Sequence, residues 1–379
     1  MSFLEYRVKF APTGFAKVLY VNWSLYLLVC ACATIGWLML YSISGGDLQQ
    51  WAEPQMKRFG VGMVLSLAIC FTPIWFWRSM SAAAYILTFI LLLVVHFFGA
   101  VGMGAQRWID LGFIRIQPSE FMKVSLIMML ATYYDWLEDR KVSRLIWVIL
   151  PVLMIIIPAV LVLTEPNLGT TLMLVVAGAS VMFAAGVSLW YFIIVLGLIG
   201  GGVAGIFLLR GTPWQLIHDY QYQRIDTFLD PSADPLGAGY NILQAKIALG
   251  SGGMSGKGFM QGTQSRLNFL PEKHTDFIFT TLGEEFGFVG ALSLLTLYAV
   301  ILIFLLWAAM QNKDRFSALL LIGIAVNFFL YLAVNLAMVM GMAPVVGVPL
   351  PFLSYGGSAT LVLLLAFGLV QSAIVHRLR

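Results

Sequence analysis

The chain has 379 residues, of which 60% are hydrophobic and only 11% are charged. Soluble domains carry about a quarter charged residues, so this composition excludes a soluble protein and indicates a polytopic membrane protein. The formal net charge of +4 is small and the basic residues are scattered, which gives no indication of a nucleic-acid-binding surface.

The apolar runs predict about ten membrane-spanning helices, because each is long enough to cross about 30 Å of hydrocarbon. They lie near residues 23–43, 60–77, 81–101, 118–137, 145–163, 168–186, 188–209, 277–310, 316–340 and 357–375. The eighth run is too long for one straight span, so it either projects beyond the bilayer or holds a break near Gly287 and Gly290. The sequence therefore predicts an all-α polytopic membrane protein that forms one domain over residues 1–379.

Lysine and arginine are unevenly distributed between the two sets of short loops, which predicts the orientation of the chain. Eleven lie in segments that are cytoplasmic when the N-terminus is inside: Arg7, Lys9, Lys17, Arg78, Arg140, Lys141, Arg144, Lys313, Arg315, Arg377 and Arg379. Four lie in the short outer loops: Lys57, Arg58, Arg107 and Arg115. We therefore expect both termini in the cytoplasm and the long loop of residues 210–276 outside it.

Charged residues flank and enter the fourth predicted span. The stretch "GAQRWIDLG" sets Arg107 and Trp108 on the outer side of the membrane. In "QPSEFMK", Pro118 suits a first helical turn, and Glu120 and Lys123, three residues apart, share one helix face. The pair is either a structural ion pair or part of a functional site, and function is the default hypothesis for charges inside a membrane.

A third outer site precedes the sixth predicted span. In "TEPNLGTTL", Glu165 lies on a tight Pro-Asn turn and Asn167 is placed to cap the following helix. Glu165 is then an acid at the same membrane level as Asp276, further along the chain. Acids and cations thus converge on the outer leaflet.

The loop of residues 210–276 is the one large polar segment. Its "GSGGMSGKG" is not a phosphate-binding P-loop, because Ser251 replaces the required first glycine and Gly258 replaces the required Ser or Thr. The loop is either a flexible linker or an ordered re-entrant or surface segment. The apolar spacing over residues 240–249 favours the second, with a short interfacial helix.

Asp276 stands directly before the eighth predicted span, in "FLPEKHTDFIF". It is either a helix N-cap, accepting from the first free amides, or a partly desolvated base at the membrane surface. The neighbouring Lys273 and His274 offer local cations, and the polar loop can close over the carboxylate. These neighbours move the interpretation towards a site.

With these stretches in order, the chain resembles the SEDS membrane proteins (shape, elongation, division and sporulation), and it is most similar to the RodA branch. The matching stretches run through the whole chain: "GAQRWIDLG", "QPSEFMK", "PNLGT", "DPLGAGYNILQAKIALGSGGMSGKG", "GTQSRLNFLPEKHTDFIFTTLGEEFGFVG" and "PVVGVPLPFLSYGGSAT". The family's essential aspartate falls on Asp276, and its paired acid and lysine fall on Glu120 and Lys123. Where relatives commonly have an acid, this chain has Asn167, so an acid's role there requires Glu165.

The resemblance implies an inverting peptidoglycan glycosyltransferase of the bacterial cytoplasmic (inner) membrane, with its active site on the extracytoplasmic face. It would polymerise lipid II into β-1,4-linked glycan strands for cell elongation and rod shape. Its implied partners are a class B penicillin-binding protein, lipid II, the nascent glycan strand and proteins of the elongation machinery. The penicillin-binding protein would dock on the apolar faces of spans eight and nine.

For such an enzyme, Asp276 is the expected general base. The leaving pyrophosphate needs its charge stabilised more than it needs a proton. The candidates for substrate binding and charge stabilisation are Arg107, Trp108, Glu120, Lys123, Glu165, Arg224, Lys273 and His274. A divalent cation (Mg²⁺ or Mn²⁺) bridging phosphate and Asp276 is an open alternative, because hard cations bind carboxylate and phosphate oxygens.

Two other classes of function compete with this interpretation. A lipid II flippase would also use buried charges along a polar path, but the polar residues gather on one side and no internal repeat indicates alternating access. A scaffold that only recruits the penicillin-binding protein explains neither the intramembrane acids nor the long outer loop. The sequence favours the enzyme.

Overall fold

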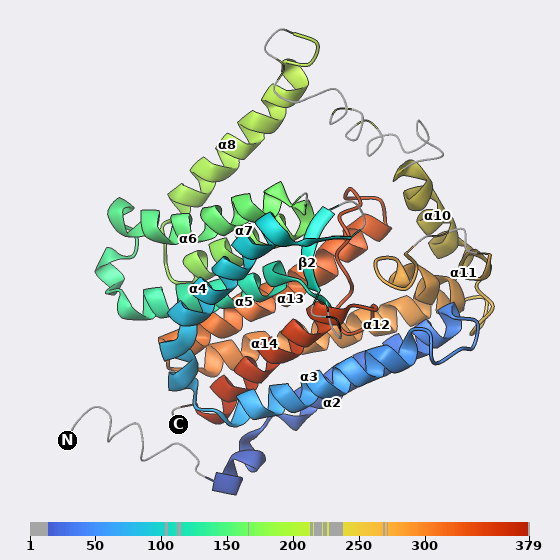
Figure 1. Ribbon diagram of the computed structural model, residues 1–379, viewed down its shortest axis with the longest axis horizontal. Helices are drawn as coiled ribbons and strands as arrows, with labels where there is room; N and C mark the ends of the chain where they lie inside the picture. The colour runs from blue at the N-terminus through green and yellow to red at the C-terminus, as the bar shows by residue number, and fades with distance from the viewer. Residues whose placement is uncertain are drawn as a thin grey trace.

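The computed structural model describes residues 14–102, 105–110, 112, 115–165, 167–212, 215, 222, 226, 238–267, 270 and 272–377. Long helices dominate the molecule and most of them run side by side (Figure 1). The helices that match the predicted spans are α2 (Trp23–Ile43), α3 (Ala52–Phe71), α4 (Ile74–Phe98), α5 (Pro118–Trp136), α6 (Leu145–Thr164), α7 (Leu168–Ala184), α8 (Leu189–Leu208), α12 (Ile278–Gln311), α13 (Arg315–Val339) and α14 (Gly357–Val375). The predicted helical polytopic fold is confirmed.

Within the described ranges, seven of these helices are long and apolar enough by themselves to cross a membrane. The other three are α3, α5 and α7. Three charged residues lie in α3 and three in α5, and α7 has only 17 residues. α3 begins eight residues before the predicted start, because the polar stretch ahead of the apolar run is also helical.

Shorter elements connect the helices. They are the 3-10 helices η1 (Gly14–Tyr20) and η2 (Asp139–Lys141) and the short helices α10 (Ala238–Ser251) and α11 (Thr263–Arg266). α10 confirms the helix predicted over residues 240–249, and it packs against α12 and α13. A small antiparallel sheet, which the sequence analysis did not predict, joins β1 (Ala100–Gly102), β2 (Ala105–Asp110) and β3 (Arg115–Ile116) in that order.

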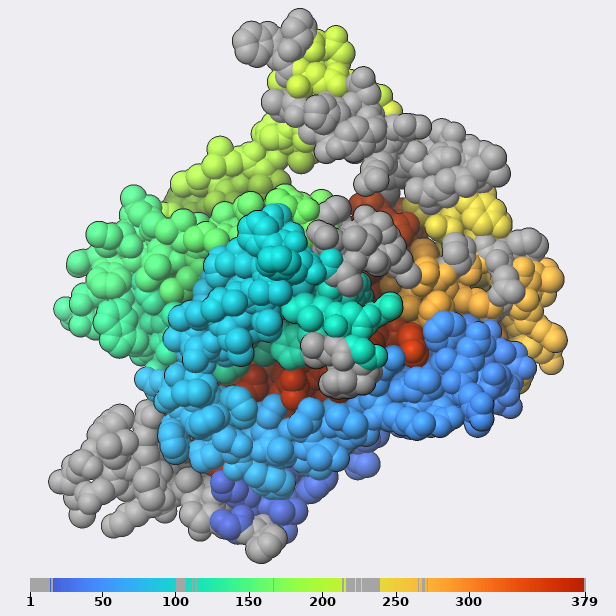
Figure 2. All heavy atoms as spheres, viewed as in Figure 1, coloured from blue at the N-terminus to red at the C-terminus, as the bar shows by residue number. Residues whose placement is uncertain are grey.

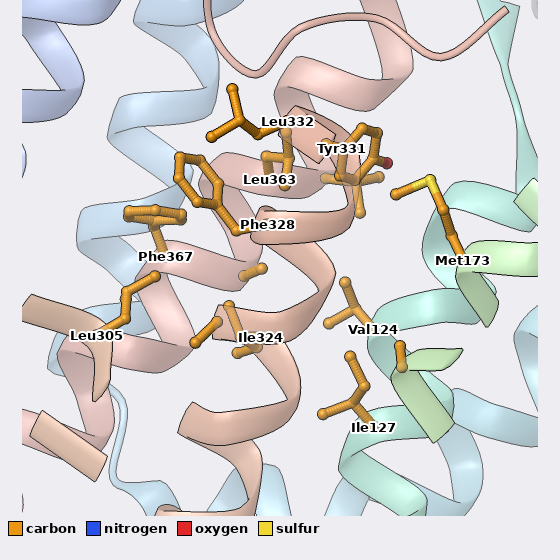
Figure 3. Close-up of a cluster of buried hydrophobic side chains, with 14 of the residues drawn as sticks. Val124, Ile127, Met173, Leu305, Ile324, Phe328, Tyr331, Leu332, Leu363 and Phe367 are labelled. Carbon is orange, nitrogen blue, oxygen red and sulfur yellow. The ribbon is translucent and has the colours of Figure 1, made fainter. Parts of the chain in front are cut away.

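α13 lies at the centre of the bundle, in contact with α5, α7, α12 and α14. Figure 3 shows its buried side chains Phe328 and Tyr331 between residues of α14 and α5. α14 packs closely along α3, where Gly368 faces the Ser66 backbone and leaves no room for a side chain. In Figure 2, α14 is visible only as narrow red patches between the helices that cover it. This dense packing holds the polar groups described below in fixed places.

Two helices keep large exposed apolar surfaces. α8 leans away from the bundle and none of its residues is buried (Figure 1). α12 exposes an apolar face that includes Ile303, Leu306, Trp307 and Met310. The expectation of a long exposed apolar face on span nine is wrong. α13 is covered by neighbouring helices, and Phe329 is its one large exposed apolar residue among those described.

The predicted break in the eighth span occurs at Gly287. Its backbone has φ 65° and ψ −160°, a conformation that favours glycine. Past this break, the amides of Phe288 and Val289 cannot reach the carbonyls of Glu284 and Glu285, their partners in a continuous helix. The break therefore leaves two donors and two acceptors that need other partners.

Residues 250–258, the glycine-rich loop, supply those partners. Phe288 N donates to Gly253 O at 2.9 Å, and Val289 N donates to Met254 O at 3.2 Å. In return, the amides of Lys257 and Gly258 donate to the carbonyls of Glu284 and Glu285, both at 3.0 Å. A methyl group at Gly252 or Gly256 would overlap the α12 backbone, which explains why glycine stands at these positions. Residues 252–258 of the loop are thus fixed against α12, which favours an ordered segment over a flexible linker for this described part.

Candidate active site

Asp276 lies in a turn of residues 272–277 that leads into α12. The amides of Thr275 and Asp276 both donate to the Glu272 carbonyl, at 3.1 and 3.2 Å. α12 begins at Ile278, its N-cap residue is Phe277, and no side chain caps it. The capping role considered for Asp276 is therefore wrong, and its carboxylate is not used to cap α12.

The surroundings of Asp276 favour its protonated form. Burial and, to a smaller extent, the nearby Glu272 raise the pKa of the carboxyl to about 7, against a hydrogen bond from Thr275 that lowers it. One carboxylate oxygen faces Gly347, and a methyl group placed there would lie 3.4 Å from it. Gly347 has φ 66°, so glycine provides both the backbone conformation and the open space beside the acid.

The loop of residues 346–355, between α13 and α14, forms the floor beneath this turn. The amide of Tyr355 donates to the His274 carbonyl at 2.9 Å. Buried Asn335 of α13 donates to two carbonyls, those of Asp276 at 2.8 Å and Val348 at 2.7 Å. In the sequence, this loop stands out only through the family resemblance, and Asn335 was not among the predicted site residues. A buried amide in an otherwise apolar helix is the signal that could have found it.

An aromatic cluster stands on another side of the turn. The His274 ring stacks on Trp51 with centroids 4.0 Å apart, and Tyr355 lies edge-on to Trp51 at 4.9 Å. The Arg58 guanidinium lies over the Tyr355 ring, 4.8 Å from its centroid. Burial lowers the pKa values of His274 and Lys273, so the imidazole is mainly neutral at pH 7. Trp51 and Arg58 were not singled out in the sequence.

Glu120 and Lys123 form the ion pair that their spacing predicts, and a third residue completes it. Lys123 Nζ donates to Glu120 Oε1 at 2.8 Å and to the Tyr331 hydroxyl at 2.5 Å. The Tyr331 hydroxyl donates to the other Glu120 oxygen. Both charged side chains are almost fully buried, at 1% and 5% exposure. The three groups therefore satisfy one another between α5 and α13.

Glu165 and Arg107 are in direct contact. Arg107 Nε donates to the Glu165 backbone carbonyl at 3.0 Å. Burial raises the pKa of the Glu165 carboxyl to about 7, although Arg107 partly offsets the effect. Asn167 accepts from the Thr170 amide and so caps α7 as predicted. Trp108 pairs with Ala100 across β1 and β2 and is half-buried.

The same loop lies between Asp276 and the start of α7. A side chain at Gly169 would collide with Val346 and Val348, whereas the neighbouring Gly347 faces Asp276. The structure thus places Asp276, Lys273 and His274 on one side of this loop and the start of α7 on the other. Arg224 lies outside the described residues.

A second acid near the start of α12 has different surroundings. Glu284 Oε1 accepts from Lys257 Nζ at 2.6 Å, from the Thr263 amide at 2.8 Å and hydroxyl at 2.9 Å, and from the Gln264 amide at 3.1 Å. The next residue, Glu285, accepts from the Ser42 hydroxyl of α2. Glu284 thus joins the glycine-rich loop and α11 to α12, and Glu285 joins α2 to α12.

Metal binding by protein groups alone is not supported here. In the part of the chain that the structure describes, no three His, Cys, Asp or Glu side chains gather so that they could hold an ion. Mg²⁺ commonly takes one or two carboxylates together with substrate phosphates. Asp276, with its open neighbour Gly347, fits one such ligand position.

Comparisons with known proteins agree with this architecture. Residues 22–378 match the cell cycle protein family model that covers FtsW, RodA and SpoVE. The chain belongs to this family.

Relatives match over nearly their whole length. The peptidoglycan glycosyltransferase MrdB of Escherichia coli K12 is 41% identical over 357 residues, which is 93% of each chain. The stage V sporulation protein E of Bacillus subtilis is 35% identical over 91% of this chain and 94% of its own.

Solved structures share the fold. The chain superposes with a TM-score of 0.79 and 28% identity on a chain from a peptidoglycan synthase complex described as coordinating polymerization and crosslinking, covering 94% of this chain and 97% of that one. The rod shape determining protein RodA of Thermus thermophilus gives a TM-score of 0.70 at 26% identity, over 95% and 98% of the two chains.

Proposed function

We propose that this protein is a peptidoglycan glycosyltransferase that polymerises lipid II outside the cytoplasmic membrane, in support of cell elongation. Membership of the family and the glycosyltransferase named at 41% identity support the activity. The excess of Lys and Arg in one set of loops supports an orientation with both termini in the cytoplasm. The turn that carries Asp276 then lies on the outer face, where the sugars and pyrophosphate of lipid II are located.

Asp276 is the general base of this proposal, and its environment is the observation that carries it. A base works best when its pKa lies near the working pH, and burial raises the pKa of Asp276 to about 7. The carboxylate takes the proton from the 4-hydroxyl of the acceptor GlcNAc. That oxygen attacks the anomeric carbon of the donor MurNAc, the bond to pyrophosphate breaks, and an α-linked donor becomes a β-1,4 linkage.

The leaving pyrophosphate carries away the bonding electrons and needs positive charge nearby. Arg107 and Lys273 are half-buried at the same end of the bundle and suit this role. Lys123 is fully engaged by Glu120 and Tyr331, so its role is to hold α5 against α13. When Mg²⁺ or Mn²⁺ is bound, Asp276 would be its protein ligand and the ion would supply charge to the pyrophosphate.

A class B penicillin-binding protein is the proposed partner. A structural neighbour with 28% identity comes from a peptidoglycan synthase complex that couples polymerization to crosslinking. The exposed apolar face of α12, with Leu306 and Trp307, offers a single membrane-spanning helix a surface inside the bilayer. The transpeptidase domain of such a partner would then stand above the outer loops.

Lipid II polymerisation by the purified protein tests the proposal. The protein, with and without its penicillin-binding protein, is incubated with lipid II and moenomycin, which silences contaminating transferases of the other kind. We expect glycan polymers from the wild-type protein and a rate at least about 10²-fold lower from Asp276→Asn. Lipid II movement across liposomes without any polymer would instead support the flippase alternative and contradict the proposal.

A further inference from the structure

Asn335 connects the Asp276 turn to the loop beneath it. Its side chain is completely buried in α13 and its Nδ2 group donates both hydrogens, one to the Asp276 carbonyl at 2.8 Å and one to the Val348 carbonyl at 2.7 Å. Val348 follows Gly347, the residue that faces the Asp276 carboxylate. The Asn335 side chain therefore links the backbone of the acid to the segment beside its carboxylate, in addition to the backbone hydrogen bond from Tyr355 to His274.

Other buried side chains also hold this loop, and they make a useful contrast. The Tyr298 hydroxyl of α12 donates to the Pro351 carbonyl at 2.6 Å, and the Gln55 amide of α3 donates to the Ser354 carbonyl at 3.1 Å. Neither of these two hydrogen bonds reaches the Asp276 turn. Of the three donors, Asn335 alone joins the loop to the acid.

The amide side chain of Asn335 is costly to bury at this position. A buried amide is costly unless both its ends are hydrogen-bonded. The Asn335 oxygen has no hydrogen-bond partner among the described residues. The side-chain oxygen of Asn335 is thus an unsatisfied acceptor inside the bundle, while the amide nitrogen donates to the carbonyls of Asp276 and Val348.

α13 also places Asn335 in register with the buried ion pair. Tyr331 and Asn335 are four residues apart, so they share a face about 6 Å apart along the helix axis. Tyr331 binds Lys123 and Glu120, which pins this part of α13 to α5. The helix that carries Asn335 is thereby held rigidly just below the Asp276 turn.

We propose that Asn335 is a positioning residue that sets the place of the Asp276 carboxylate through the Asp276 and Val348 carbonyls. The inference rests on the proposed role of Asp276 as the base. Displacing a catalytic group by about 1 Å can lower a rate by about 10²-fold without changing substrate affinity. Asn335 therefore acts on the chemical step and leaves lipid II binding unchanged.

The test compares Asn335→Leu with Tyr298→Phe in the full-length protein. Both changes remove buried donors to the same loop, but only the first touches the Asp276 turn. For polymerisation of lipid II, we expect Asn335→Leu to lower kcat about 10²-fold with KM within about twofold. Tyr298→Phe is expected to keep kcat within about twofold to threefold, even where it lowers the melting temperature. Equal loss of kcat in the two variants, or a normal kcat for Asn335→Leu, would overturn the proposal.

A double variant separates positioning from a general structural effect. If Asn335 acts through the Asp276 carboxylate, Asn335→Leu should lower the residual single-turnover rate of Asp276→Asn by less than about twofold. The same 10²-fold loss in both backgrounds would show a structural role and refute the inference. If Asn335→Leu fails to insert or fold, Asn335→Ser, which is too short to bridge both carbonyls, replaces it with the same expectations. Full activity of Asp276→Asn alone would refute the base itself, which is a different result.

Discussion

Asp276 and Glu284 lie eight residues apart near the start of α12, and their carboxylates have opposite surroundings. Four donors from Lys257, Thr263 and Gln264 converge on one oxygen of Glu284. At Asp276, burial and Glu272 disfavour the charge and only Thr275 supports it. Four donors on one oxygen hold Glu284 in its charged form and join segments of the fold, whereas the raised pKa of Asp276 allows it to take up a proton.

The largest expected effect comes from exchanging each acid for its amide. Asp276→Asn should lower the polymerisation rate by about 10²–10⁴-fold, because a general base contributes that much. The variant should still fold, because the side chain caps no helix. Glu284→Gln should keep the rate within a few-fold and lower the melting temperature instead. The contrast fails if a well-folded Asp276→Asn protein polymerises lipid II at the wild-type rate.

Glu120 and Lys123 of α5 are also charged groups with hydrogen-bond partners, and they lie inside a predicted membrane span. Removing one partner by Glu120→Gln or Lys123→Met should reduce the free energy of unfolding by about 3–5 kcal/mol, because a lone charge stays buried. The double variant should be at least as stable as either single variant. Unfolding of the detergent-solubilised protein measures all three. Unchanged melting and activity in both single variants would show that the groups are not a buried pair.

The glycine-rich loop offers a smaller effect. Lys257→Met removes the cation from Glu284 and should cost about 1.5–3 kcal/mol, the range for hydrogen bonds to charged groups. Lys57→Met breaks an exposed pair with Glu53 at 2.6 Å and should cost less than about 1 kcal/mol. Melting temperatures of the two variants give the comparison. Equal, small shifts would mean that the loop adds little to the stability of α12.

The smallest expected effect is the pH response of Asp276. With its pKa near 7, the active carboxylate form grows about tenfold between pH 6 and pH 8, and kcat/KM should rise with it. The contribution of the Asp276 carboxyl to the free energy of unfolding changes in the opposite direction, falling as pH rises. The folded-state pKa lies above the ordinary value of 3.8, so this contribution is complete below pH 3.8 and is lost as pH rises through 7.

Glu272 provides the control for that response. Its charge raises the pKa of Asp276, so Glu272→Gln should move the midpoint of the rate profile to lower pH. A profile that stays in place in this variant would show that another group titrates. A flat wild-type profile between pH 6 and pH 8 would contradict the role of Asp276 as the base.

The sequence by itself determined the helices, because hydrocarbon leaves a spanning segment few alternatives to internal hydrogen bonding. Apolar run lengths indicated the helices, Gly287 indicated the break in α12, and the spacing of Glu120 and Lys123 indicated their pair. β2 was missed although glycines stand before it, because its residues AQRWID show no alternation of apolar and polar side chains. Family resemblance then identified Asp276 as the candidate base.

Tertiary structure alone decided which polar groups are satisfied. Lys257 lies 27 residues before Glu284, and Asn335 lies 59 residues after Asp276. The spacing of residues in the sequence does not predict such contacts. They depend on how the glycine-rich loop packs at the break in α12 and on how α13 lies beneath the Asp276 turn. Two acids near the start of α12 therefore have different surroundings: Glu284 joins the glycine-rich loop and α11 to the helix, and Asp276, in the turn before it, has a raised pKa.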